Sequence, residues 1–390
     1  EVAQLTMICD RLFGEQNYIS CFPWHNRTSI QNDTDMSVNH EYIIAYAKKR
    51  RQENRRLKLQ NFNTWYNTND FVFQPMETNP AKFSNTDNDP RGNWKADPFD
   101  APAIRANLTY AIINPSTNQK FLPPKGRHWR TEEAKYMALL ADNRIVFGKK
   151  GTSKPQLKVF LSEALAKGEI RNSCFDADVF DTSTSGKKEL LSILHDTEIF
   201  DTVKPTKLYY ELIKMSLSPR VSNPIILDFF AGSGTTGHAV MKFNSIETRD
   251  CKFILVTNNQ NNICRDVAYE RIKRVIEKEN YPASLKYYKV DFIPIDEQLY
   301  YEYADKLLYH VRELVELENG INFTGNAKIA IILTDDELGK FIDNIGDFKK
   351  CKTIYLGHDV LLNGEQETLL KEQKIKVNVI PDYYYRELEG

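Results

Sequence analysis

The 390-residue chain is short of the features that mark secreted, disulfide-linked or membrane proteins. Its few cysteines form no C-x-x-C pair and have no histidine partner at zinc-site spacing: they are Cys9, Cys21, Cys174, Cys251, Cys264 and Cys351. A disulfide framework or a structural zinc site is therefore not expected, and a reducing cytosol fits. No apolar run approaches the roughly 18 residues of a transmembrane helix, so we expect no membrane span and no signal peptide.

The chain also lacks an excess of charge of either sign. Its formal net charge is -1, so affinity for an anionic partner would have to come from local basic patches such as residues 48–58, "KKRRQENRRLK". A solvated linker or helix face explains that run equally well. The histidines have neither metal-site nor catalytic-triad spacing, and we assign each a core or surface role: His25, His40, His128, His195, His238, His310 and His358.

What remains is an ordinary globular composition, 41% hydrophobic and 27% charged, with room for two or three domains. In the first half, periodicity predicts a helix at 1–13, strands at 17–26 and 40–49, and helices at 131–142 and 157–168. The rest of residues 60–200 is rich in loops.

Regular alternation of strands and helices begins after residue 200. The pattern predicts a helix at 204–217, a strand at 223–230, a helix at 234–244, a strand at 251–257 and a helix at 263–278. A smaller unit from about 295 has predicted helices at 297–317 and from Asp335, and strands at 327–334, 352–357 and 375–380. The alternation in residues 204–278 favours a parallel sheet covered on both faces.

The segment "PIILDFFAGSGTTGHAV", residues 224–240, is the strongest signal of a site. A buried strand, a glycine turn and a helix let backbone amides approach a ligand closely. The turn satisfies G-x-G-x-x-G, but the acid that a nicotinamide cofactor needs about 20 residues later is replaced by polar residues 257–260. Asp228 precedes the glycines, where an acid suits a cofactor with a cationic end, such as S-adenosylmethionine. A tight turn without a ligand is the alternative.

Residues 228–240 resemble motif I of the β class of DNA amino-methyltransferases, in which this motif lies in the C-terminal half. Upstream, "FDTVKPTKLYYELI" at 200–213 resembles their motif X. Other stretches are similar to the Mod (modification) subunits of type III restriction-modification systems, at 12–27, 39–49, 88–95, 122–130, 143–163 and in the tail from 327. The resemblance covers essentially the whole chain in the family's motif order.

The resemblance implies an α/β fold, with a Rossmann-like S-adenosylmethionine-dependent methyltransferase sheet, an inserted irregular target-recognition domain and a small C-terminal α/β domain. The implied boundaries are 1–50 for the remaining part of the catalytic half, 51–195 for target recognition, 196–294 for the cofactor-binding part and 295–390 for the C-terminal domain.

The same resemblance implies two sets of site residues and no metal. The S-adenosylmethionine site would comprise Asp228, Phe229, Phe230, Ala231, Gly232, Ser233, Gly234, Thr235 and Thr236, with Lys204, Pro205 and Thr206 at the methionine end and Asn258 near the ribose. DNA would be contacted by Arg91, Trp94, Lys125, Arg127, Trp129 and Arg130, in loops that can present side chains to a groove. For the two tryptophans, a role as core anchors is the alternative.

One element of the family pattern is missing. The catalytic D-P-P-Y-like motif would hold the target amine and stack the flipped base. It is absent here, because the one Pro-Pro of the chain follows Leu122. In the family this motif precedes the helix predicted at 1–13, so we expect a fragment that begins inside the catalytic domain and is inactive alone.

The sequence therefore favours a bacterial, cytoplasmic, site-specific DNA methyltransferase acting on adenine N6. Double-stranded DNA, a second copy of the chain and a helicase-nuclease restriction subunit are the partners that the resemblance implies. A cytosine-N4 methyltransferase, and a non-catalytic DNA-recognition module on a methyltransferase scaffold, stay open as alternatives. A nicotinamide-dependent oxidoreductase is the least favoured.

Overall fold

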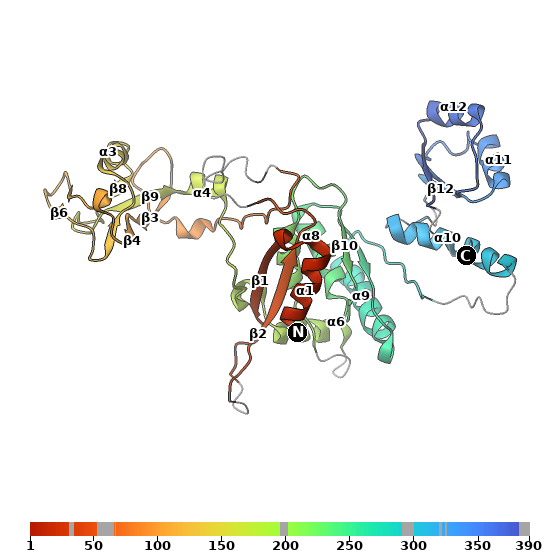
Figure 1. The fold of residues 1–390 in the computed structure, drawn as a ribbon, viewed down its shortest axis with the longest axis horizontal. Coiled ribbons are helices and arrows are strands. Elements are labelled where there is room, and N and C mark those ends of the chain that lie inside the picture. The colour runs from red at the N-terminus through yellow and green to blue at the C-terminus, as the bar shows by residue number, and fades with distance from the viewer. Residues whose placement is uncertain are drawn as a thin grey trace. The chain divides into compact units, whose positions relative to one another are not determined.

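The computed structural model describes residues 1–30, 35–52, 66, 68–195, 202–290, 300–319, 322–323 and 326–381. The chain divides into two units, and many of their elements are labelled in Figure 1. Unit 1 comprises residues 1–25, 34–176 and 214–220, and unit 2 comprises residues 26–33, 177–213 and 221–390. Within the described ranges, no helix is both long enough and apolar enough to cross a membrane.

Unit 1 begins with a helix and an antiparallel strand pair, as predicted. Helix α1 (Val2–Phe13) ends at Gly14, whose φ of 84° suits a residue without a side chain. After the 3-10 turn η1 (Glu15–Asn17), β1 (Tyr18–His25) pairs with β2 (His40–Tyr46). The Tyr46 hydroxyl donates to Asp10 Oδ1 at 2.7 Å and so fastens α1 to β2.

The rest of unit 1 consists of short elements around an aromatic core. The antiparallel strands are β3 (Trp94–Pro98), β9 (Gln156–Phe160) and β8 (Ile145–Val146) in one sheet, β4 (Asp100–Pro102) with β7 (Arg127–Trp129), and β5 (Ile112–Ile113) with β6 (Lys120–Phe121). The helices are α3 (Glu133–Ala141) and α4 (Leu161–Lys167), with 3-10 turns η3 (Pro80–Lys82) and η4 (Ala106–Leu108). Phe99, Ile112, Trp129, Tyr136, Ile145 and Phe147 form the core. Packing of these side chains, rather than long runs of hydrogen bonds between strands, stabilises this part of unit 1.

The helix predicted over residues 157–168 is wrong in its first third. Residues up to Phe160 belong to β9, which pairs with β3 on one side and β8 on the other, and the helix starts at Leu161. Strand pairing on both sides outweighs the local helical periodicity of this segment.

The first part of unit 2 alternates strands and helices as predicted. The elements are α5 (Ala177–Phe180), α6 (Ser183–Leu194), α7 (Thr206–Ser216), β10 (Ile225–Asp228), α8 (Thr235–Glu247), β11 (Lys252–Leu255), the 3-10 turn η5 (Gln260–Asn262), the π-helical η6 (Ile263–Tyr269) and α9 (Glu270–Glu279). Strands β10 and β11 are parallel neighbours. Helix α6 was not predicted from the sequence, although Thr182 caps its N-terminus and Leu190, Ile193 and Leu194 form its buried face.

The C-terminal part of unit 2 contains the three strands predicted from the sequence. Its elements are α10 (Tyr300–Asn319), β12 (Ile329–Ile332), α11 (Asp335–Asp343), β13 (Thr353–Leu356), α12 (Gly364–Glu372) and β14 (Lys376–Val379). The three strands form a parallel sheet, β12-β13-β14, with Ile332, Ile354 and Leu356 in its core. The protein is thus of mixed α/β class, as expected. The Rossmann-like arrangement and the four domain boundaries stay predictions.

Candidate cofactor-binding site

The turn between β10 and α8 has a left-handed backbone at two positions, a conformation that favours glycine. Gly232 and Gly234 have φ values of 50° and 73°. A Cβ at Gly234 would lie 3.2 Å from the carbonyl oxygen of Ala268, so this glycine also permits a close approach to η6. The amide of Ala231 donates to the carbonyl of Val256 at 3.0 Å, which ties the turn to the end of β11.

Asp228 fixes the end of the strand to the start of the helix. Its Oδ1 accepts a hydrogen bond from the amide of Phe230 at 3.0 Å, and its Oδ2 accepts one from the hydroxyl of Thr236. Each oxygen of an ionised carboxylate has two acceptor sites, so one on each remains for a ligand.

The side chains of the turn separate into a buried and an exposed group. Ala231, Ser233, Thr235 and Thr236 are buried, whereas Phe229 is 64% and Phe230 93% exposed. Two exposed phenylalanines in sequence are unfavourable in water and offer an apolar surface beside the turn.

Residues 204–206 contact the turn, although they lie 31 positions before it. The Thr235 hydroxyl donates to the carbonyl of Lys204 at 3.2 Å. Thr206 is buried, and its hydroxyl donates to Glu189 Oε2 at 2.6 Å. The structure thus brings together two parts of the predicted site. Asn258, the remaining candidate, is exposed and lies just after β11.

Arg271, which was not among the site residues expected from the sequence, connects these parts. Its side chain is completely buried. Nη1 donates to Ser233 Oγ at 3.3 Å and Thr235 Oγ1 at 2.8 Å, and Nη2 donates to Glu189 Oε2 at 3.2 Å and Thr206 Oγ1 at 3.0 Å. One guanidinium therefore joins the glycine turn, residues 204–206 and helix α6.

A signal for Arg271 was present in the sequence. Val267, Arg271 and Val275 are spaced by four residues, which places a cation on the apolar face of the helix. A buried arginine needs a partner, and the partner here is Glu189 of α6. Burial lowers the pKa of Arg271 to about 10, so the guanidinium is still charged at neutral pH.

His238 of α8 belongs to the same buried group. Its Nδ1 lies 3.3 Å from Thr206 Oγ1 and 3.4 Å from Arg271 Nη2, and its Nε2 lies 3.4 Å from Glu279 Oε1. Burial, and then the charge of Arg271, lower the pKa of His238 to about 4. The ring is therefore neutral at pH 7, and its role is the core role expected.

We expect His238 to make the chain less stable as pH falls from about 6.5 to about 4. The folded pKa lies below the ordinary value of 6.5, so the unfolded chain binds more protons in this window. The contribution of His238 to the free energy of unfolding is complete above pH 6.5, and about 3 kcal/mol of it is lost by pH 4. Urea unfolding between pH 4 and 8 measures it, with His238→Gln as the comparison. Equal pH dependence of the two proteins would contradict the prediction.

The candidate DNA-contacting tryptophans of unit 1 differ in burial. Trp129 is completely buried, and its Nε1 donates to the carbonyl of Tyr110 at 2.8 Å. It is a core anchor, as the alternative interpretation held. Trp94 of β3 is half-buried and donates to Asp87 Oδ1 at 3.1 Å.

The candidate arginines of unit 1 all lie beside carboxylates. The pairs are Arg91 with Asp89 and Asp142, Arg127 with Asp100, and Arg130 with Asp97. The hydrogen bonds that Arg91 donates to the carboxylate of Asp89 raise the pKa of Arg91 further above its ordinary value. Arg127 and Arg130 keep 36% and 39% of their side chains exposed, and Lys125 is exposed. Of the basic run 48–58, residues 53–58 lie outside the described residues.

Comparison with known proteins gives a consistent result. The sequence model of the DNA methylase family, which comprises N6 and N4 methyltransferases, matches residues 1–248. The chain is 32% identical to the Mod subunit of the type III restriction-modification enzyme StyLTI of Salmonella typhimurium, over 73% of this chain and 42% of that protein. It is 26% identical to the EcoP15I Mod subunit of Escherichia coli, over 76% and 50%. It is 24% identical to the type II methyltransferase M.KpnI of Klebsiella pneumoniae, over 75% and 70%. The chain thus spans about half the length of the two Mod subunits.

Proposed function

The chain belongs to the DNA methylase family, and on this premise we propose that it binds S-adenosylmethionine and DNA as part of a site-specific methyltransferase of a type III restriction-modification system. The observation that carries the proposal is the junction at Arg271, where the glycine turn and residues 204–206 meet. The likeness to Mod subunits supports the type III assignment. Adenine N6 is the target amine that we propose first. Cytosine N4 is the second candidate, since the family model covers both chemistries.

The residues of the turn fit S-adenosylmethionine. Positive φ at Gly232 and Gly234 opens the backbone to a ligand, and Asp228 keeps acceptor sites for a cationic group. We assign residues 228–236, 204–206 and Asn258 to the cofactor, within a Rossmann-like domain at 196–294. When bound, this cofactor supplies an electrophilic methyl group. The protein's own task is to hold it in position against the target amine.

We assign DNA binding to Lys125, Arg127 and Arg130, which flank or form β7 and keep exposed charge. Arg91 and Trp94 fix the neighbouring loop, and Trp129 supports it from the core. We therefore propose that residues 51–195 form the target-recognition domain. Residues 1–50 would belong to the catalytic half of the methyltransferase domain, and residues 295–390 would form a separate C-terminal domain. A homodimer and a restriction subunit are the proposed protein partners, and the naming of the relatives as subunits of restriction-modification enzymes supports the second.

The 390-residue chain should bind S-adenosylmethionine but neither NAD nor NADP in calorimetric titrations. It should also transfer no label from methyl-labelled cofactor to mixed-sequence DNA, because it contains no D-P-P-Y-like motif to hold the amine. Transfer should appear when a second polypeptide carrying that motif from a Mod relative is added. Digestion of the labelled DNA then separates N6-methyladenine from N4-methylcytosine.

Each other outcome has a distinct meaning. Label in DNA without the second polypeptide would show that other residues of the chain place the amine. DNA binding without cofactor binding would favour a non-catalytic recognition module. Binding of a nicotinamide cofactor would overturn the assignment of the turn.

A further inference from the structure

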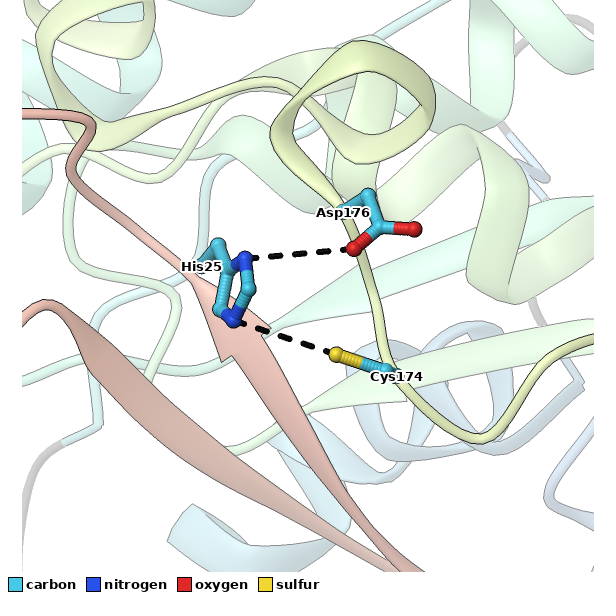
Figure 2. A group of neighbouring side chains, drawn as sticks. All are labelled: His25, Cys174 and Asp176. Carbon is cyan, nitrogen blue, oxygen red and sulfur yellow. Dashed lines mark hydrogen bonds and ion pairs between the residues drawn. The ribbon is translucent and has the colours of Figure 1, made fainter.

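Three side chains with metal-ligating atoms meet at the end of β1 in unit 1 (Figure 2). Nε2 of His25 lies 3.8 Å from Sγ of Cys174, and Nδ1 of the same ring lies 3.8 Å from Oδ1 of Asp176. One ligand atom of each residue lies within 4.8 Å of those of the other two. Because 149 positions separate His25 from Cys174, ligand spacing in the sequence could not detect this group.

The backbone holds the three residues in place through Phe175. This side chain is completely buried and stacks on Phe22, with ring centroids 4.6 Å apart. Its amide donates to the carbonyl of Pro23 at 2.9 Å, and its carbonyl accepts from the amide of His25 at 3.0 Å. The segment thus extends beside β1, with a parallel bridge between Trp24 and Phe175.

The alternation of an extended chain explains why both ligands face the histidine. Since Phe175 points into the core, its two neighbours, Cys174 and Asp176, point the other way. Figure 2 shows both turned toward the His25 ring. The ligand atoms therefore meet because of backbone pairing and core packing, and do not depend on a flexible loop.

The donor set selects the kind of ion. Imidazole nitrogen, thiolate sulfur and carboxylate oxygen together suit a borderline ion, and zinc takes all three. Nitrogen and sulfur ligands of a tetrahedral zinc ion lie about 3.6 Å apart, from bond lengths of about 2.1 and 2.3 Å. The separation of His25 Nε2 and Cys174 Sγ is 3.8 Å. The side chains of His25 and Asp176 are 43% and 54% exposed, so they can turn toward an ion and leave one position to water.

We propose that His25, Cys174 and Asp176 bind Zn²⁺, with water as the fourth ligand. His25 and Asp176 are also the residues after which the chain passes from unit 1 to unit 2. A bound ion would join these two exits of the chain and stabilise unit 1 there. The proposal is independent of the cofactor site.

The test uses the full chain, reduced and freed of metal. Zn²⁺ is titrated in competition with a chromophoric chelator, and Co²⁺ is titrated to detect the charge-transfer absorption of a cobalt-thiolate bond. We expect one equivalent to bind. Cys174→Ser should abolish the charge-transfer band, and His25→Gln and Asp176→Asn should weaken Zn²⁺ binding about 10- to 100-fold. Cys21→Ser, which removes another thiol from β1, should change neither signal.

Thermal unfolding distinguishes a loss of Zn²⁺ binding in the Cys174→Ser variant from a failure of that variant to fold. Zn²⁺ should raise the melting temperature of the wild-type chain and of Cys21→Ser, but not that of Cys174→Ser, whose metal-free form should melt like the wild type. Equal Zn²⁺ affinity in Cys174→Ser and the wild type would overturn the proposal. So would alkylation of Cys174 at the same rate with and without Zn²⁺, which would indicate a free reactive thiol.

Discussion

Replacing Arg271 by methionine should cost about 3–5 kcal/mol of folding stability, because it removes one partner from a buried ion pair. Methionine fills the space of the side chain but donates no hydrogen bond. Glu189 would lose its cationic partner, and the hydroxyls of Ser233 and Thr235 would lose the donor that holds them. S-adenosylmethionine binding should be lost with the geometry of the turn.

Urea unfolding and calorimetric titration measure the two effects of Arg271→Met. Lys273→Met is the matched control, since it removes an exposed cation from the same helix and should leave both quantities unchanged. Arg271→Lys keeps the charge without the fork of donors, so it should fold and bind the cofactor weakly. Wild-type cofactor affinity in a folded Arg271→Lys would show that the junction does not shape the turn.

Gly186→Ala should weaken cofactor binding about tenfold or more and cost about 1–3 kcal/mol of stability. A Cβ at Gly186 would lie 2.7 Å from the carbonyl carbon of Lys204 and 2.7 Å from the nitrogen of Pro205. These are backbone atoms, which cannot rotate away as a side chain does. Helix α6 and residues 203–205 would have to separate, and the bond from Thr235 to the carbonyl of Lys204 would be strained.

Gly339→Ala is the matched control for Gly186→Ala. Gly339 lies inside α11, and an added Cβ there would meet no atom within 4 Å. The substitution should stabilise the chain by up to about 1 kcal/mol through helix propensity alone. If Gly186→Ala also proved stabilising, with unchanged cofactor affinity, the close approach of residues 203–205 to α6 would not hold in solution.

The candidate site could be predicted from the sequence where its chemistry is local. The strand, glycine turn and helix at 224–240 carry their own hydrophobic and glycine signals, and the structure has all three elements. The C-terminal strands were predictable for the same reason. The expected burial of the strand at 224–228 is wrong, because Ile225 and Leu227 are 47% and 46% exposed. Residues 204–206 were placed beside the turn by resemblance to a family rather than by any pattern of their own.

What could not be predicted depends on contacts between distant residues. The pairing of Glu189 with Arg271 spans 82 positions, and the spacing of charges along the chain contains no trace of it. The strand character of residues 157–160 came from partners at 94–98. The residues next to Trp129 in the sequence are compatible with a loop that contacts a DNA groove. Its contacts with Phe99 and Tyr110, which are distant in the sequence, show that it is a core residue.

The junction at Arg271 also sets an order of events during synthesis. Its five side-chain partners emerge from the ribosome first, and the nearest of them, His238, lies 33 positions earlier. Until residue 271 follows, Glu189 lacks its cation, and the hydroxyls of Ser233 and Thr235 lack the guanidinium donor. Closing contacts of such sequence separation is slow compared with forming the local helices. The ability to bind the cofactor should therefore arise late in folding. It would depend on the assembled unit 2 and not on the segment 224–240 alone.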